Sequence, residues 1–160
     1  MKEKIKELTV YLVIILVVIL IRTFLVTPIR VNGTSMYPTL DNGNFMVLKK
    51  YDKDIERFDI IVIKRGKDKL IKRVVGLPKE DIEYSDNELY INNEKMSDSY
   101  GDGSTTDFVD YCAQDEYYVL GDNREDSTDS RVFGCVKKEN ILGTTDFVIF
   151  PFGSRFGKVD

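Results

Sequence analysis

The 160-residue sequence contains no histidine. This absence excludes a Ser-His-Asp triad, a Cys-His dyad and every metal site built on imidazole ligands. Cysteine is almost as scarce, and two cysteines cannot form an all-cysteine zinc site. A hydrolase of this composition must take its base from lysine, from a carboxylate or from water on a carboxylate-bound metal. With 42% hydrophobic and 31% charged residues, the chain is otherwise typical of about one globular domain.

Basic residues are in the minority outside the N-terminus. Residues 1–26 carry four basic and two acidic side chains, a net charge of +2. The remaining chain has 19 basic and 25 acidic residues, a net charge of −6. Nucleic-acid binding needs a concentrated basic face, so we expect no nucleic-acid partner.

A long apolar run occupies residues 8–26, interrupted only by Arg22 near its end. Its 19 residues approach the roughly 20 needed to span a bilayer, and a long basic side chain near one end can reach the headgroups. We expect a single-pass helix in the cell membrane that contacts lipid. Three lysines precede the run, so the positive-inside rule places residues 1–7 in the cytoplasm and residues 27–160 outside.

A cleaved signal peptide is the competing interpretation of the same N-terminus. No Ala-x-Ala follows the apolar run, and Ala113 is the single alanine of the chain. Val31-Asn32-Gly33 is a conceivable cleavage site, but it lies well beyond the apolar core. We therefore favour a retained anchor.

Beyond residue 27 the pattern is mostly β, with no strong helical period. Apolar and β-branched segments alternate with Gly, Asn, Asp and Pro turn signals, which predicts an all-β domain of folded or barrel-like sheets. The predicted strands are 29–32, 44–50, 59–64, 69–76, 88–92, 116–120, 131–136 and 145–150.

The acidic segment 97–110 reads as an exposed loop. We do not expect an EF-hand beginning at Asp98, because Tyr100 stands at a ligand position and Val109 replaces the closing Glu.

Two segments can carry chemistry, although each has an ordinary structural interpretation. Ser35 lies two residues after Gly33 and three before Pro38, an arrangement that can fix a hydroxyl in place, but a solvent-exposed turn serine is the simpler interpretation. Lys72 lies in a predicted strand, between Leu70 and Val74 on one face. Burial there lowers a lysine pKa and produces a base, unless the amine escapes to water.

A third segment, residues 121–131, holds four acids, two arginines and two serines between apolar strands. It fits a solvated hairpin tip, and it equally fits a loop shaped by internal ion pairs.

Together these segments resemble the type I signal peptidases, membrane-anchored Ser/Lys proteases, in their compact Gram-positive form. The resemblance runs nearly end to end and includes the anchor. It is carried by Ser35-Met36-Tyr37-Pro38-Thr39-Leu40, Asp59-Ile60-Ile61-Val62, Lys72-Arg73-Val74-Val75-Gly76-Leu77-Pro78, and Gly121-Asp122-Asn123-Arg124 through Ser127, Asp129, Ser130 and Arg131.

The resemblance implies a serine endopeptidase that removes signal peptides from exported preproteins through an acyl-enzyme, without cofactor or metal. Residues 27–160 would be the catalytic domain, with Ser35 as nucleophile and Lys72 as general base. The implied supporting residues are Ser127, which orients the lysine, and Asp129, Arg131, Arg73 and Asp122. The backbone N–H of Ser35 would meet the oxyanion.

Two positions depart from the family pattern. Gly33 stands where some members have a serine that donates to the oxyanion, and Lys79-Glu80-Asp81 replaces a usual Gly-Asp.

The family also implies a substrate preference. The preprotein should pair as an added strand beside residues 29–33 and 70–72, with small, Ala-x-Ala-like residues at the first and third positions before the cut. The residues expected to line the shallow substrate pockets are Ile29, Val31, Met36, Leu40, Leu70 and Ile71.

Three rival functions remain. One is a peptidase dedicated to pilus subunits, which segment 97–110 would serve. Another is a non-hydrolytic relative that assists assembly of exported subunits, which retention of both Ser35 and Lys72 disfavours. The third is a purely structural anchored domain, which leaves the motifs unexplained.

Cys112 and Cys135 form the one possible disulfide outside the cytoplasm. They lie 14 and 9 residues from a turn near residue 126, so in a simple hairpin they would not face each other. We expect free or buried cysteines without a chemical role.

Overall fold

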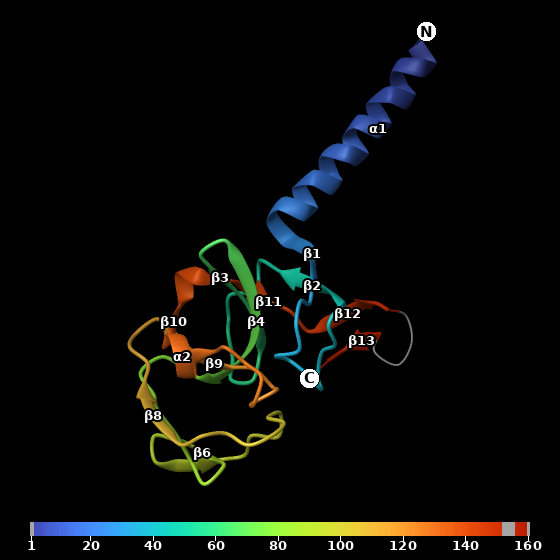
Figure 1. Ribbon diagram of the computed structural model, residues 1–160. Coiled ribbons are helices and arrows are strands. Elements are labelled where there is room, and N and C mark those ends of the chain that lie inside the picture. The colour runs from blue at the N-terminus through green and yellow to red at the C-terminus, as the bar shows by residue number, and fades with distance from the viewer. Residues whose placement is uncertain (1, 152–155, 160) are drawn as a thin grey trace.

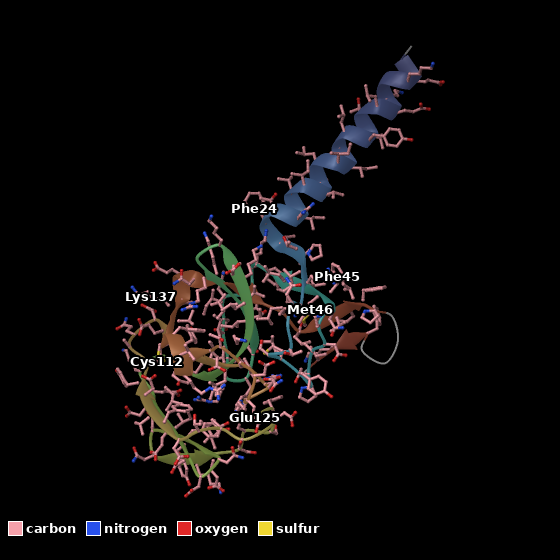
Figure 2. All side chains as sticks on the ribbon, in the orientation of Figure 1. Phe24, Phe45, Met46, Cys112, Glu125 and Lys137 are labelled. Atoms are coloured by element: carbon pink, nitrogen blue, oxygen red, sulfur yellow. A yellow bond between two sulfur atoms is a disulfide. The ribbon has the colours of Figure 1, made fainter. Side chains whose placement is uncertain are left out.

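The computed structural model describes residues 2–151 and 156–159. It begins with helix α1 (Lys2–Leu20), which continues through a π-helical turn, η1 (Ile21–Leu25). Figure 1 shows α1 projecting from the rest of the chain, and Figure 2 shows its side chains pointing outward on all sides. The apolar span Lys6–Leu25 has a mean hydropathy of 2.7 and buries nothing against the domain. Such a surface needs an apolar environment that the protein itself does not supply.

The remaining chain is mostly antiparallel β, which confirms the predicted fold class. Within the part of the chain that the structure describes, the larger sheet has nine strands in the order β10-β9-β4-β3-β11-β2-β12-β13, with β1 paired to β2. Its strands are β1 (Val26–Arg30), β2 (Phe45–Lys49), β3 (Ile60–Arg65), β4 (Asp68–Gly76), β9 (Glu116–Leu120), β10 (Val136–Lys137), β11 (Ile141–Thr144), β12 (Phe147–Phe150) and β13 (Gly157–Lys158). Across the described residues this sheet does not close into a barrel.

The smaller sheet lies at the end of the molecule far from α1 (Figure 1). Its order is β7-β6-β5-β8, formed by β5 (Asp81–Ser85), β6 (Glu88–Ile91), β7 (Glu94–Met96) and β8 (Phe108–Tyr111). Two tight turns connect β5, β6 and β7, and each has two consecutive residues with positive φ, Asp86-Asn87 and Asn92-Asn93. Asp and Asn tolerate this region, and such turns match the twist of paired strands.

Three buried apolar clusters hold the sheets together. On β4, Leu70 and Val74 pack into one cluster and Ile71 into another, as strand alternation requires. Pro28 lies in β1, which among the described strands pairs with β2 alone, and an edge strand tolerates the missing N–H. β1 therefore leaves one side unpaired close to the base of the helix.

Several predicted elements need correction. Residues 131–136 are not one strand: the Asp129 carboxylate accepts the Arg131 N–H and caps the short helix α2 (Ser130–Phe133), and β10 begins at Val136. Strands β5, β7, β11 and β13 were not predicted, because they are short and, apart from β11, carry polar or charged residues at half or more of their positions. The 3-10 turn η2 (Lys138–Asn140) precedes β11.

The expectation of a wholly exposed loop at 97–110 is wrong. β8 begins at Phe108, and Thr105 is buried. Asp98 forms an ion pair with Arg124 at 2.5 Å and accepts a hydrogen bond from Tyr84 at 2.8 Å. Part of this segment is therefore packed against the main body by a buried charge pair.

The expectation of free cysteines is also wrong. Cys112 and Cys135 are joined in a disulfide, with Cα atoms 5.7 Å apart. The hairpin register does not oppose them, since Val136 pairs with Tyr117. Instead the chain reverses just after Cys112, where the Glu116 N–H donates to the Ala113 carbonyl at 3.2 Å. This reversal carries Cys112 back alongside β9, to the level of Cys135, which counting outward along a straight hairpin cannot show.

Candidate active site

Ser35 and Lys72 come together from distant parts of the sequence. The Lys72 Nζ lies 2.6 Å from the Ser35 Oγ. Ser35 occupies a turn after β1, where the Tyr37 N–H donates to the Thr34 carbonyl at 3.0 Å. The next side chain, Met36, is 1% exposed and packs into the apolar core. The turn therefore holds the serine between a hydrogen-bonded bend and a buried anchor.

Lys72 is buried in the middle of β4, opposite Ile61 of β3. Its side chain is 3% exposed, and this desolvation lowers its pKa from 10.5 to about 8. Asp129 and Asp122 act in the opposite direction, because a nearby negative charge favours the protonated amine. Burial prevails, so a useful fraction of the amine is neutral near physiological pH. A neutral amine in contact with a hydroxyl can accept its proton.

The segment 121–131 is shaped by internal bonds rather than solvated. Asp129 is fully buried and accepts the Gly121 N–H at 3.0 Å and the Arg131 guanidinium at 2.8 and 2.9 Å. Burial by itself would raise the pKa of Asp129, but the bonds from Arg131 and Gly121 hold that pKa below its usual value. A permanent negative charge therefore lies near the lysine.

Gly121 lies where only a glycine fits. A Cβ at this position would collide with the Ser35 carbonyl and with the Ser127 side chain. The Ser127 hydroxyl is itself buried. The close approach brings the backbone of segment 121–131 directly against the serine turn.

Arg73 and Asp122 form a second buried ion pair behind the dyad. The Arg73 guanidinium donates to both Asp122 oxygens at 2.8 and 2.9 Å and to the Phe58 carbonyl at 2.8 Å. It also lies 3.8 Å from the centre of the Tyr100 ring. All three nitrogens of this desolvated cation thus donate a hydrogen bond, and β4 is tied to segment 121–131.

Asn123 and Asp126 have a positioning role that the sequence did not reveal. The Asn123 backbone N–H donates to the Ser35 carbonyl at 3.1 Å, and its side-chain amide to the Thr34 carbonyl at 3.3 Å. The Thr34 hydroxyl donates to the Asp126 carboxylate at 2.5 Å. Each of these bonds joins residues about 90 positions apart in the sequence, so no local sequence pattern predicts them.

Arg124 was also missed. It is buried, donates to the Gly121 carbonyl at 3.0 Å and to the Tyr84 hydroxyl at 2.7 Å, and pairs with Asp98. An arginine between an asparagine and a glutamate in a polar loop gives no sign of burial. Through these bonds the smaller sheet supports segment 121–131, which contacts the Ser35 turn.

The dyad opens into a narrow cleft that continues into a wider groove. The cleft has a volume of about 40 Å³ and is lined by both dyad residues, Val31, Met36, Leu70 and Ile71, among others. The groove has a volume of about 540 Å³ and runs between β1 and the first half of β4, with Ile29, Leu70 and Ile71 in its walls. Leu40, the remaining residue expected to contact substrate, is fully buried in the core and lines neither space.

The family described as signal peptidase, peptidase S26, matches residues 4–150. Signal peptidase I T of Bacillus subtilis strain 168 is 37% identical over 156 residues, which cover 86% of this chain and 81% of that protein. Signal peptidase I S of the same strain is 37% identical over 169 residues, covering 94% and 92%. A signal peptidase I from Enterococcus faecalis V583, known as a crystal structure, superposes with a TM-score of 0.54 at 36% identity, covering 58% of this chain and 97% of that chain.

Proposed function

Because the chain belongs to the peptidase S26 family of signal peptidases, we propose that it is a membrane-anchored serine endopeptidase that removes signal peptides from exported precursors through a Ser35–Lys72 dyad. The observation that carries this proposal is the 2.6 Å contact between the two side chains, in a setting that lowers the lysine pKa to about 8.

The reaction follows from that contact. Neutral Lys72 takes the Ser35 proton, the Ser35 Oγ attacks the scissile carbonyl, and the Ser35 backbone N–H donates to the oxyanion. The protonated lysine then gives its proton to the leaving amine, which releases the mature protein and leaves an acyl-enzyme. Lys72 next takes a proton from water, whose hydroxide attacks the ester and releases the signal peptide as a carboxylate.

The buried acids stabilise the charged form that Lys72 passes through. Asp129 and Asp122 both favour the protonated amine. Desolvation leaves a fraction of the amine neutral near physiological pH and so able to accept a proton, while the carboxylates limit the cost of the ammonium during the reaction. Ser127, buried against Gly121, is the proposed neighbour that orients the lysine.

The substrate is proposed to enter as an extended strand between β1 and β4. β9 pairs with β4 only from Arg73 onward, so the half of β4 before Lys72 is unpaired on that side. β1 is likewise unpaired on one side. A peptide added there places its scissile bond at the dyad. The cleft of about 40 Å³ fits the small residues proposed at the first and third positions before the cut.

The anchor is proposed to place enzyme and precursor on the same membrane. Residues 8–26, which overlap the exposed apolar span Lys6–Leu25, cross the bilayer, residues 1–7 stay in the cytoplasm, and the catalytic domain, residues 27–160, lies outside. Confinement to one surface raises the effective concentration of the membrane-bound precursor.

The test uses full-length protein in mild detergent with a preprotein. Wild type should release the mature protein, with its new N-terminus identified by mass spectrometry, and Ser35→Ala and Lys72→Ala should each abolish release. Ser99→Ala and Lys137→Ala, at exposed positions, are the matched controls and should retain activity. Near-normal turnover by either dyad variant would refute the dyad. An intact preprotein after incubation with wild type would instead favour the non-hydrolytic alternative.

A further inference from the structure

The groove that leads to the dyad is basic on the side far from the cut. Lys67 and Lys69 line it together with Arg30, and Asp68 is the one acid among the described residues that line it. Lys67 and Lys69 are exposed, and neither takes part in an ion pair of residues 2–151 and 156–159. Lys69 lines the cleft of the dyad as well. The groove therefore carries a net positive charge that is available to a ligand.

The two walls of the groove run in the same direction. β1 starts directly after the membrane span and leads to Ser35, while β4 starts at Asp68 and leads to Lys72. Pro28 faces the groove together with Lys67, at one end, and Ser35 faces the cleft together with Lys72, at the other. In Figure 1 the turn between β3 and β4 lies at the end of the domain that faces α1. The groove thus leads from the membrane side to the dyad.

A precursor must run along the groove in this same direction, because its apolar signal segment lies in the membrane and its cleavage site reaches the dyad. Residues before the cut then lie beside Lys69 and Lys67. An extended peptide advances about 3.3 Å per residue, as β4 does. The residue directly before the cut lies level with Lys72, and Lys69 and Lys67 lie three and five residues further back, Lys67 in the turn just before β4. The lysines therefore lie level with substrate positions about four to six residues before the cut.

We propose that Lys67 and Lys69 form a specificity site that favours precursors with an acidic side chain, and disfavours a basic one, about four to six residues before the cut. The inference rests on the proposed function and adds a substrate preference to it. Both lysines are solvent-exposed, so the preference is moderate and weakens as salt screens the charges.

The test compares two precursor peptides that differ only in an aspartate or a lysine five residues before the cut. Full-length protein in phosphatidylcholine vesicles, which carry no net charge, should cleave the aspartate peptide with about fivefold higher kcat/KM. The ratio should fall towards one in 1 M salt. Lys67→Glu combined with Lys69→Glu should invert the preference. Lys137→Glu, the same change at an exposed site outside the groove, should leave it unchanged.

Equal cleavage of the two peptides by wild type would overturn the proposal, as would a preference that survives the double reversal. A preference found only in vesicles with anionic lipid would assign the lysines to headgroups and also overturn it. Failure to cleave either peptide would refute the proposed function itself, and is therefore distinguishable from failure of the specificity site.

Discussion

Replacing Lys72 by methionine should make the protein more stable at neutral pH while abolishing activity. The lysine pKa falls from 10.5 to about 8 on folding because the amine is buried. At pH 7 most of the amine is still protonated in both states, so the folded protein carries the cost of a desolvated charge. At 1.36 kcal/mol per pKa unit this cost is roughly 3 kcal/mol. Methionine fills a similar volume without a charge.

The sign of the pH dependence follows from the same shift. Between pH 8 and 10.5 the unfolded chain binds the proton that the folded protein has lost, so wild type gains stability as pH rises through this window. The free-energy cost of burying the protonated Lys72 amine is almost fully present below pH 8 and falls below about 1 kcal/mol by pH 10. Loss of the bond to Ser35 removes about 1 kcal/mol at every pH. The variant should therefore exceed wild type by about 2 kcal/mol at pH 7 and match it at pH 10.

Thermal unfolding of full-length protein in mild detergent measures this difference. At roughly 3 °C per kcal/mol, Lys72→Met should raise Tm by about 6 °C at pH 7 and leave it unchanged at pH 10. Lys137→Met, at an exposed position, should show no pH-dependent difference. If Lys72→Met lowered Tm equally at both pH values, the buried lysine would not carry the desolvation cost on which the argument depends.

Three further predictions follow from the packing of the site and the membrane span. Gly121→Ala should reduce kcat by at least about 100-fold with the fold retained by circular dichroism, because its Cβ collides with Ser35 and Ser127; normal turnover would contradict this. Replacing Cys112 and Cys135 by serine should remove about 3 kcal/mol of stability, since the bond closes a segment of 23 residues; an unchanged urea midpoint would refute it. Protease added to intact spheroplasts should digest the domain beyond the anchor, and a protected domain would overturn the orientation.

The general fold could be predicted because it depends on strong local sequence patterns. The apolar run near the N-terminus and the alternation around Lys72 depend on local residue order alone. In the smaller sheet β6 was predicted. β5 and β7 escaped prediction because polar or charged residues occupy half or more of their positions, and β8 because it begins inside the acidic segment 97–110. Helix α2 was missed because a single carboxylate, Asp129, caps an otherwise strand-like sequence.

The candidate site shows the same division: local sequence patterns predict some of its features, and others depend on the fold. The family motifs identified the dyad and the residues of two ion pairs, Asp129–Arg131 and Arg73–Asp122. The hydrogen bonds that hold these residues in place depend on contacts between distant segments. Asn123 reaches the serine turn, and Arg124 reaches the smaller sheet at Tyr84 of β5. Counting along a hairpin misplaced Cys112 for a comparable reason, since one chain reversal changed its position relative to Cys135.

The pH dependence of kcat/KM tests the Ser35–Lys72 dyad most directly. A neutral Lys72 is required to accept the Ser35 proton, so kcat/KM for a preprotein should rise about tenfold per pH unit below pH 8 and level off above it. A rate that peaks in acid and disappears above neutrality would show that a carboxylate, not Lys72, is the base.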